Sequence, residues 1–196
     1  NKSEKNVRVE NYFNLTAVKS ATLSSRDLKK QFKEILIHTF ENIKNLQRPI
    51  YVPLSGGMDS RLVVSILKEL NCRNVYSFSY GDINNYEVKT AKRVSEKLNV
   101  EWSFFPLNKA IQKSSMLSEE FQKYLSNFDT GCSTPFRQDF AVIHHNKKYF
   151  HKDGIIINGN TGDFITGGHM PDFFTNPNQL SKEDLLQYIC KKHYTL

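Results

Sequence analysis

The sequence predicts an α/β fold in which a twisted parallel sheet carries helices on both faces, and three observations support this prediction. Short apolar runs alternate with amphipathic stretches of helical length, which is the order that builds βαβ units and a parallel sheet. The apolar run 50–54 is followed by a glycine turn and then by a helical stretch. A second glycine-rich turn follows another apolar run, at 154–158.

The totals place the chain among ordinary globular proteins. It has 196 residues, of which 39% are hydrophobic and 24% are charged, enough for a core in one or two domains. No apolar run approaches the ~18 residues of a membrane-spanning helix, so we expect no membrane partner. The chain has no initial Met and no signal peptide, so we expect a part of a longer protein. Residues 1–23 are predicted to be a connector and residues 24–196 the folded domain.

Charge and cysteine content limit the partners and the compartment. The net charge is +7, with lysines scattered among Asp and Glu. This favours a solvated lysine-rich surface, and a polyanion such as tRNA, or ATP itself, is the alternative. No aromatic-basic motif of a nucleic-acid module occurs, so we expect no nucleic-acid partner. Cys72, Cys132 and Cys190 are far apart and odd in number. They argue against a disulfide framework and predict a reducing compartment, the cytoplasm.

The first helix is predicted to begin after a capping serine, Ser24 or Ser25, and to run to about Asn45. Apolar residues recur along it at three- and four-residue steps, so this stripe is expected to pack beside the central strand. The stripe consists of Leu28, Phe32, Ile35, Leu36, Phe40 and Ile43. Pro49 ends the connection, and the central strand follows at 50–54.

Two strand and helix pairs are predicted next. A helix over 61–70 leads to a strand at Val75–Tyr80, and a helix at Glu87–Leu98 leads to a strand at Val100–Phe105. Ligands of open parallel sheets bind at the carboxyl ends of the strands. We therefore expect Tyr80, at the end of the second strand, to face the same crevice as the first glycine turn.

The last third of the chain is predicted to hold three helices and one strand. One helix covers Ile111–Asn127, and another begins with Pro135 at its first position and runs to about Asn146. The β-branched run Gly154–Asn158 predicts a buried strand. A final helix is predicted at Ser181–His193.

The segment from Ser55 to Ser60 is the main candidate for a ligand site. A strand, a glycine turn and a helix aim backbone N–H groups and a helix N-terminus at an anion. Gly56 and Gly57 allow the backbone to approach a phosphate closely. The carboxylate of Asp59 is explained if it holds a divalent cation that the phosphate also binds. The alternative is an ordinary strand–helix turn with a capping side chain.

The second glycine-rich turn, Gly159–His169, contains the single acid Asp163. We interpret Asp163 as the completion of a cation site begun by Asp59, because two carboxylates with phosphate oxygens and water suit Mg²⁺. A surface loop without function is the alternative.

The run Ser55-Gly56-Gly57-Met58-Asp59-Ser60 resembles the Ser-Gly-Gly-x-Asp-Ser pyrophosphate loop of the N-type ATP pyrophosphatases. The second turn narrows the resemblance to the asparagine synthetase family, whose frame it keeps. The positions that keep this frame are Asn158, Gly159, Asp163, Gly167 and Gly168. The resemblance covers about residues 8–170. It implies an adenine nucleotide alpha hydrolase-like, Rossmann-like domain, truncated here at its C-terminus and preceded by a missing N-terminal domain.

The resemblance also implies an activity and its partners. A substrate carboxylate would attack ATP to give an acyl-adenylate and pyrophosphate, and ammonia from glutamine, or an amine, would then displace AMP to form an amide. The implied partners are a small-molecule carboxylate, ammonia or glutamine, and an N-terminal glutaminase domain of the parent chain. A homodimer is left open.

The resemblance assigns a role to individual residues. Asp59 and Asp163 would be the catalytic residues and the ligands of Mg²⁺. The residues in contact with the adenosine part of ATP would be Leu54, Tyr80, Asn158 and Gly159. The residues that hold pyrophosphate would be Ser55, Gly56, Gly57, Asp59 and Ser60.

The second turn departs from the family pattern at several positions, and β-lactam synthetase relatives have a closer variant of it. Asn160 replaces an acid, Phe164 a Glu, Thr166 a Phe and His169 a Tyr. The ATP chemistry is therefore expected to be kept and the acceptor pocket to be altered. Two other hypotheses follow: an ATP-binding domain with altered catalysis, and an adenylating tRNA-modifying enzyme. The second is disfavoured because the paired cysteines of thiolating members are missing.

Overall fold

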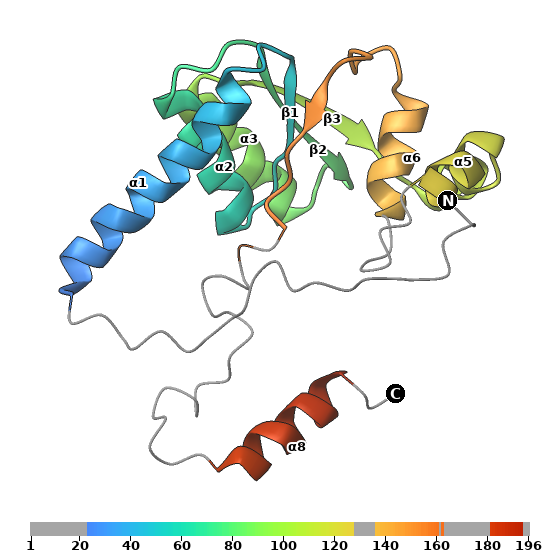
Figure 1. Ribbon diagram of the computed structural model, residues 1–196. Helices are drawn as coiled ribbons and strands as arrows, with labels where there is room; N and C mark the ends of the chain where they lie inside the picture. Colours follow the sequence, from blue (N-terminus) through green and yellow to red (C-terminus); the bar gives the residue numbers. More distant parts are fainter. Residues whose placement is uncertain (1–22, 128–135, 161, 163–180, 194–196) are drawn as a thin grey trace, which may run out of the picture.

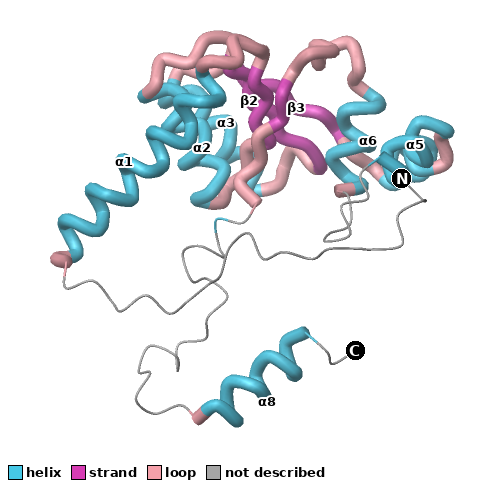
Figure 2. The backbone as a smooth tube through the Cα atoms, in the orientation of Figure 1, coloured by secondary structure: helices cyan, strands magenta, loops and turns pink. Residues whose placement is uncertain are grey.

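The computed structural model describes residues 23–127, 136–160, 162 and 181–193. Four parallel strands form one sheet in the order β3-β2-β1-β4. The strands are β1 (Ile50–Pro53), β2 (Val75–Gly81), β3 (Glu101–Pro106) and β4 (Ile155–Ile156). Figures 1 and 2 show the sheet at the centre with helices on either side, which confirms the predicted fold class.

The helices divide between the two faces of the sheet. α1, α2 and α3 pack on one face, and α6 packs on the other beside α4 and α5. Their bounds are α1 (Ser25–Lys44), α2 (Met58–Glu69), α3 (Tyr86–Leu98), α4 (Lys109–Met116), α5 (Glu119–Asn127), α6 (Arg137–His145) and α8 (Lys182–His193). Ser24 caps α1 as predicted, since its hydroxyl oxygen accepts a hydrogen bond from the N–H of Asp27 at 3.2 Å.

The side chains of β1 alternate between the two faces of the sheet and contribute to a hydrophobic core on each face. Ile50 and Val52 face α1, α2 and α3, where Leu67 of α2 is fully buried. Tyr51 points to the other face and stacks on Tyr76 with ring centroids 5.2 Å apart. The sheet therefore has an aliphatic face and an aromatic face. The further aromatic residues of that second face are Phe78, Tyr80, Phe105, Tyr149 and Phe150.

Pro53 limits how far β4 can pair with β1. The N–H groups of Ile50 and Leu54 donate to carbonyl oxygens on the β2 side, at 2.9 and 2.8 Å. Strand alternation then places the nitrogen of Pro53 on the β4 side, where it has no hydrogen to donate. The last backbone bond between β4 and β1 runs from the N–H of Ile157 to the oxygen of Tyr51 at 3.0 Å. Beyond it the described residues show no further pairing of β4 with β1, and the segments that follow the two strands line a common pocket.

The prediction that the whole apolar stripe of α1 packs in the core is wrong for its first half. Phe40 is buried and Leu36 and Ile43 pack against the core, whereas Leu28 is 47% and Ile35 is 64% exposed. The reason is length. α1 has 20 residues, about 30 Å, and β1 has only four, so the first turns of α1 extend past the sheet.

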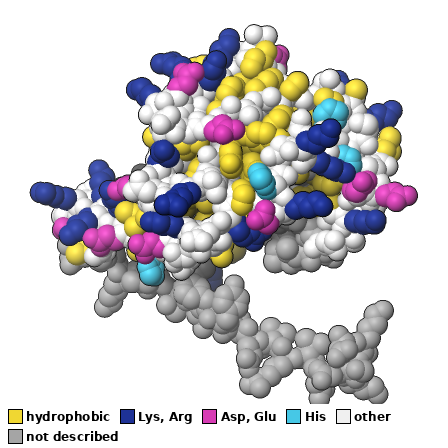
Figure 3. All heavy atoms as spheres, turned by 90° about the horizontal axis from the view of Figure 1, so that it is seen from above, with side chains coloured by type: hydrophobic (Ala, Val, Ile, Leu, Met, Phe, Trp, Pro, Cys, Tyr) yellow, Lys and Arg dark blue, Asp and Glu magenta, His cyan; other side chains and the backbone are white. Residues whose placement is uncertain are grey.

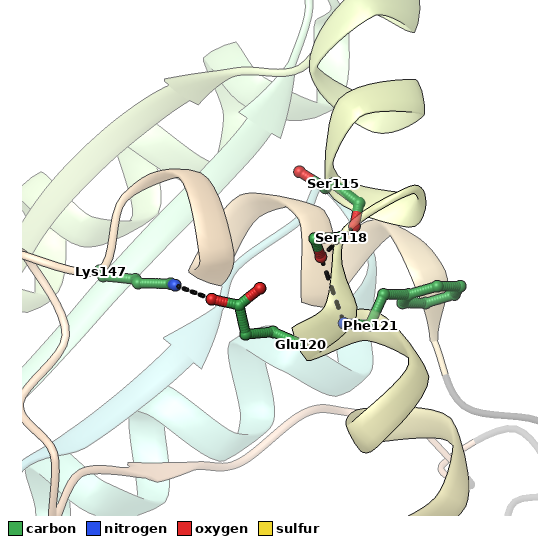
Figure 4. A network of polar contacts seen from close by, with 5 residues as sticks. All are labelled: Ser115, Ser118, Glu120, Phe121 and Lys147. Carbon is green, nitrogen blue, oxygen red and sulfur yellow. Dashed lines mark hydrogen bonds and ion pairs between the residues drawn. The ribbon is translucent and has the colours of Figure 1, made fainter.

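The single helix predicted over 111–127 is two helices, because Ser118 interrupts it. The Ser118 hydroxyl donates to the carbonyl oxygen of Ser115 at 2.6 Å and accepts from the N–H of Phe121 at 3.2 Å, so it ends α4 and begins α5 (Figure 4). Lys147 contacts Glu120 of the new first turn at 3.3 Å. A serine in this position favours a helix start over a helix interior.

Two further predictions need correction. The run 154–158 was expected to be a buried strand, but only Ile155–Ile156 is strand and Ile156 is 38% exposed. Among the described residues β4 pairs with a single strand, β1, so it is an edge strand there. The helix expected to start at Pro135 starts at Arg137, with Phe136 as its N-cap. Pro135 itself lies outside the described residues.

The surface carries charges of both signs. On the face shown in Figure 3, Lys and Arg side chains are scattered around the rim with acidic side chains between them, and hydrophobic side chains gather in the middle. None of the described helices combines the length and the apolar character needed to cross a bilayer.

Leu67→Ala should lower the free energy of unfolding by about 2–5 kcal/mol, because it leaves a cavity between α2 and the sheet. Urea denaturation measures the loss. Leu62→Ala on the same helix is the control, since Leu62 is 42% exposed and its truncation should cost far less. Equal losses in the two variants would contradict the position of the core.

Candidate active site

The first glycine turn is held in shape by its own hydroxyl groups. The N–H of Ser55 donates to Ser60 Oγ at 3.1 Å, and the two serine hydroxyls lie 3.2 Å apart. The N–H of Gly57 donates to Ser55 Oγ at 3.1 Å. Gly57 is the N-cap of α2. The turn therefore curls over the start of a 12-residue helix, whose N-terminus carries a partial positive charge.

Gly56 is required because the turn presses against the start of α3. A Cβ added to Gly56 would lie 3.1 Å from the Cα of Glu87 and 3.3 Å from its Cγ. This is tighter than ordinary contact, and one of the two atoms belongs to backbone. A larger residue would push the turn away from α3, so glycine is needed for packing as well as for access to a ligand.

The second glycine segment lies directly on the first residues of α2. A Cβ on Gly159 would lie 2.6 Å from the backbone nitrogen of Ser60 and 2.9 Å from the Cβ of Asp59. A Cβ on Gly162 would overlap the carboxyl group of Asp59. The two segments are about a hundred residues apart in the sequence and meet at a carboxylate. This contact between Gly159, Gly162 and the start of α2 is called the glycine contact below.

A hydrogen-bonded chain fixes the strand ends beneath the site. Ser79 Oγ donates to the carbonyl oxygen of Leu54 at 2.6 Å and accepts from Trp102 Nε1 at 3.0 Å. Ser79 is buried, with 4% exposure. Leu54 directly follows β1, Ser79 lies in β2 and Trp102 near the start of β3, so this chain of hydrogen bonds ties the end of β1 to both other strands. The sequence analysis did not identify Ser79 or Trp102 as supports of the site.

A pocket of about 350 Å³ opens between these elements. The strand ends and turn residues that line it are Pro53, Leu54, Ser55, Gly57, Asp59, Ser60, Phe78, Ser79 and Tyr80. The remaining lining residues are Asn85, Glu87, Val88, Phe136, Gln138, Asp139, Asn158, Gly159 and Asn160. The pocket lies where ligands bind in open parallel sheets, outside the carboxyl ends of the strands.

Most of the predicted site residues meet in this pocket. Eight of them line it: Leu54, Ser55, Gly57, Asp59, Ser60, Tyr80, Asn158 and Gly159. Gly56 lies beside it, against Glu87. Asp163, the predicted second metal ligand, lies outside the described residues, so its role stays a prediction. Within the described ranges no group of three or more His, Cys, Asp or Glu side chains forms a metal site.

Asp139 is a member of the pocket that the sequence analysis missed. The hydroxyl of Tyr80 donates to its Oδ1 at 2.7 Å. Burial raises the pKa of the Asp139 carboxyl, and the hydrogen bond from Tyr80 acts in the opposite direction. Burial, followed by the interaction with Asp139, raises the pKa of the Tyr80 phenol. No spacing in the sequence relates these residues, because they come from β2 and α6 and lie 59 positions apart.

Comparison with protein families gives one match over most of the chain. Residues 31–189 match the sequence model of the family described as asparagine synthase. No curated protein matches the chain.

Several solved structures resemble the chain at low sequence identity. The NH3-dependent NAD synthetase of Campylobacter jejuni, in complex with nitrate, matches 74% of this chain and 61% of its own, with 17% identity and a TM-score of 0.40. The NMN synthetase of Francisella tularensis matches 71% and 58%, with 16% identity and a TM-score of 0.45. A predicted subunit of tRNA methyltransferase from Methanocaldococcus jannaschii matches 74% and 64%, with 16% identity and a TM-score of 0.36. The chain thus spans less than two thirds of each.

Gly159→Ala should loosen the glycine contact, because its Cβ would meet backbone atoms that cannot turn away. A cost of about 1–3 kcal/mol corresponds to hydrogen exchange at 155–160 that is about five- to 150-fold faster. Hydrogen–deuterium exchange measures it. Gly57→Ala is the matched control, since its Cβ would meet only the Ser55 hydroxyl, at 3.2 Å. If the backbone amides exchange at the same rate in the two variants, the close packing of Gly159 on α2 is contradicted.

Asp139→Asn should gain stability relative to the wild type as the pH rises from about 4, the ordinary pKa of Asp, through the raised pKa of the folded state. Burial raises the pKa of Asp139 in the folded state above that in the unfolded state. As the pH rises, the unfolded state therefore loses this proton first and the wild type loses stability, whereas at lower pH the carboxyl is protonated in the folded and the unfolded state alike. The amide keeps an oxygen for Tyr80 and cannot ionise. Urea denaturation over this pH range measures the difference. A relative stability that is constant or falls with pH contradicts the raised pKa.

Proposed function

The chain belongs to the asparagine synthase family, and we propose that it is the ATP-using domain of a carbon–nitrogen ligase. In this proposal a substrate carboxylate is activated with ATP, AMP and pyrophosphate are released, and an amide is formed. The observation that carries the proposal is the glycine contact, which brings both glycine-rich segments to one carboxylate, Asp59, at the mouth of a pocket.

The first glycine turn suits the pyrophosphate part of ATP. The start of α2 offers the backbone N–H groups of a first helical turn and the positive end of the helix dipole. The hydroxyls of Ser55 and Ser60 lie on the same side, in the pocket lining. Such groups stabilise a departing pyrophosphate without reorganisation, which is how preorganised sites lower a barrier.

Asp59 fits a role as a ligand of Mg²⁺. It is half-buried, lines the pocket, and lies in the first turn of α2. Magnesium bound to nucleotides is held in proteins by one or two carboxylates together with phosphate oxygens and water. Asp163 is the proposed second ligand. The ion would neutralise charge on the pyrophosphate. A structural alternative, that Asp59 only complements the helix dipole, does not explain why Gly162 approaches its carboxylate so closely.

The proposed chemistry proceeds in two displacements. An oxygen of the substrate carboxylate bonds to the α-phosphorus while the bond to pyrophosphate breaks, giving an acyl-adenylate. A nitrogen of ammonia or an amine then bonds to the acyl carbon, AMP leaves, and the nitrogen gives up a proton. The pocket contributes positioning of the reactants at the strand ends and neutralisation of charge.

The proposal includes partners beyond this chain. Ammonia would come from glutamine through an N-terminal glutaminase domain of a longer parent protein, for which residues 1–23 would be the connector. The acceptor would be a small carboxylic acid, and aspartate is one candidate. The cytoplasm would supply ATP and keep the cysteines reduced. A homodimer remains an open alternative.

A second candidate function, an ATP-binding domain without ligase turnover, is favoured by Asn160. Its neutral amide lines the pocket at a position where the resembled family has an acid. This candidate shares the nucleotide site with the first and differs in the acceptor chemistry. An adenylating tRNA-modifying enzyme is the third candidate, and salt-sensitive tRNA binding would support it.

Asp59→Ala should reduce the release of pyrophosphate from ATP by at least about a hundredfold, because the phosphate end of the site loses its carboxylate. The measurement is product analysis on the intact protein with Mg²⁺, ATP, ammonia and a panel of carboxylic acids. Met58→Ala is the control. Met58 is 78% exposed and is not part of the pocket lining, so the activity of the Met58→Ala variant should stay within about twofold of that of the wild type.

The products separate the candidates. AMP and pyrophosphate that depend on one acid identify a ligase and its acceptor. ADP and phosphate would refute the proposed chemistry, and so would near-normal turnover by Asp59→Ala. Tight ATP binding by the wild type without any turnover would favour the binding domain.

A further inference from the structure

The pocket has two chemically different ends. At one end lie the N–H groups, the hydroxyls and the helix start that suit phosphate, around Ser55 and Ser60. At the other end lie Tyr80, Gln138 and Asp139, contributed by β2 and α6. The phosphate end also carries the carboxylates of Asp59 and Glu87, and the Mg²⁺ proposed at Asp59 would offset their charge. Asp139 has only the neutral Tyr80 hydroxyl as its partner among the described residues, so its carboxylate repels a phosphate and favours the neutral part of a ligand.

Asp139 is held in place with one oxygen engaged. Its Oδ1 accepts the Tyr80 hydroxyl at 2.7 Å, and within the described part of the chain no hydrogen bond reaches its Oδ2. The strand that carries Tyr80 is fixed in turn by Ser79, which bonds to Leu54 and Trp102. Asp139 lies in the first turn of α6. The carboxylate is therefore positioned before a ligand arrives, and with respect to the described residues its Oδ2 is available as an acceptor.

We propose that Asp139 recognises the nucleoside part of ATP by accepting a hydrogen bond from it, with Tyr80 as the residue that positions the carboxylate. The inference rests on the proposed function and adds a specificity-determining residue to it. The donor is either the exocyclic amine of adenine or a ribose hydroxyl, which present the same chemistry to a carboxylate oxygen.

The other members of this end fit a nucleoside. Phe136 lines the pocket and the residue is 53% exposed, so its ring offers a flat apolar surface to a heterocyclic base. Gln138 contributes an amide that both donates and accepts. A purely structural role for Asp139 would need only the bond to Tyr80. It would not explain why a half-buried carboxylate faces the pocket at a cost in desolvation.

Calorimetric titration of the intact protein in the presence of Mg²⁺ tests the proposal. The ligands are ATP and inorganic pyrophosphate, and the proteins are the wild type, Asp139→Ala and Asp59→Ala. Asp139→Ala should weaken ATP binding about ten- to a hundredfold and leave pyrophosphate binding within about twofold. Asp59→Ala should weaken both ligands, because it acts at the phosphate end.

Analogues of ATP identify the donor. Inosine triphosphate has a carbonyl in place of the exocyclic amine, and 2′-deoxy-ATP and 3′-deoxy-ATP each lack one ribose hydroxyl. The analogue that lacks the donor should bind the wild type and Asp139→Ala equally well. If the wild type and Asp139→Ala bind one of these analogues with equal affinity, the proposal is supported and the missing group is the donor. If Asp139→Ala binds all three analogues as much more weakly than the wild type as it binds ATP, the proposal is overturned.

The remaining outcomes are also decisive. ATP binding by Asp139→Ala as tight as that of the wild type overturns the inference, and so does an equal loss for ATP and pyrophosphate, which marks a structural role. If Asp139→Ala does not fold, Asp139→Asn replaces it, since the amide can keep the bond to Tyr80, and a loss confined to ATP is again expected. A wild type that binds neither ligand contradicts the proposed function itself, and the inference falls with it.

Discussion

The close approach of Gly159 and Gly162 to the start of α2 is the constraint on which the site depends. Atoms of Asp59 and Ser60 lie where a side chain on either glycine would have to be. The first turn also packs against α3 through Gly56. The glycine contact adds a second neighbour, the turn lines one side of the pocket, and Asp59 is partly shielded from water. Shielding strengthens electrostatic interactions of a carboxylate with a cation or a phosphate.

The sheet makes this contact available. In the order β3-β2-β1-β4 the chain adds strands on one side of β1 and then returns to its other side, so a crevice forms between β1 and β4. Pro53 contributes by removing the donor that would have extended the pairing of β4. The segment after β4 is thereby free to cross over α2. On the opposite side, Ser79 ties the end of β2 to β1 and leaves room for Tyr80 to reach α6.

The charged side chains that line the pocket are the carboxylates of Asp59, Glu87 and Asp139, so anion binding depends on backbone N–H groups, hydroxyls and a cation. The helix start, the hydroxyls around Ser55 and the proposed cation ligand Asp59 lie together, while Asp139 comes from α6 and is bonded only to a neutral hydroxyl among the described residues. A ligand with an anionic and a neutral part is bound in one orientation by such an arrangement. ATP is a ligand of this kind, in agreement with the family to which the chain belongs.

The sequence by itself determined the fold class, the central strand, the first glycine turn and its role as the start of a helix, because these depend on local patterns of apolar residues and glycines. It also identified eight residues that line the pocket. The tertiary structure alone decided the partners of those residues. The bond between Tyr80 and Asp139 joins two elements with no common spacing, and the need for Gly159 arises only from atoms of Asp59 and Ser60 a hundred positions away. Periodicity shows only which residues can pack. The exposed half of α1 was missed because the short sheet, and not the helix pattern, decides how much of α1 is covered. The break at Ser118 was missed because a local hydrogen bond of its hydroxyl ends the helix there.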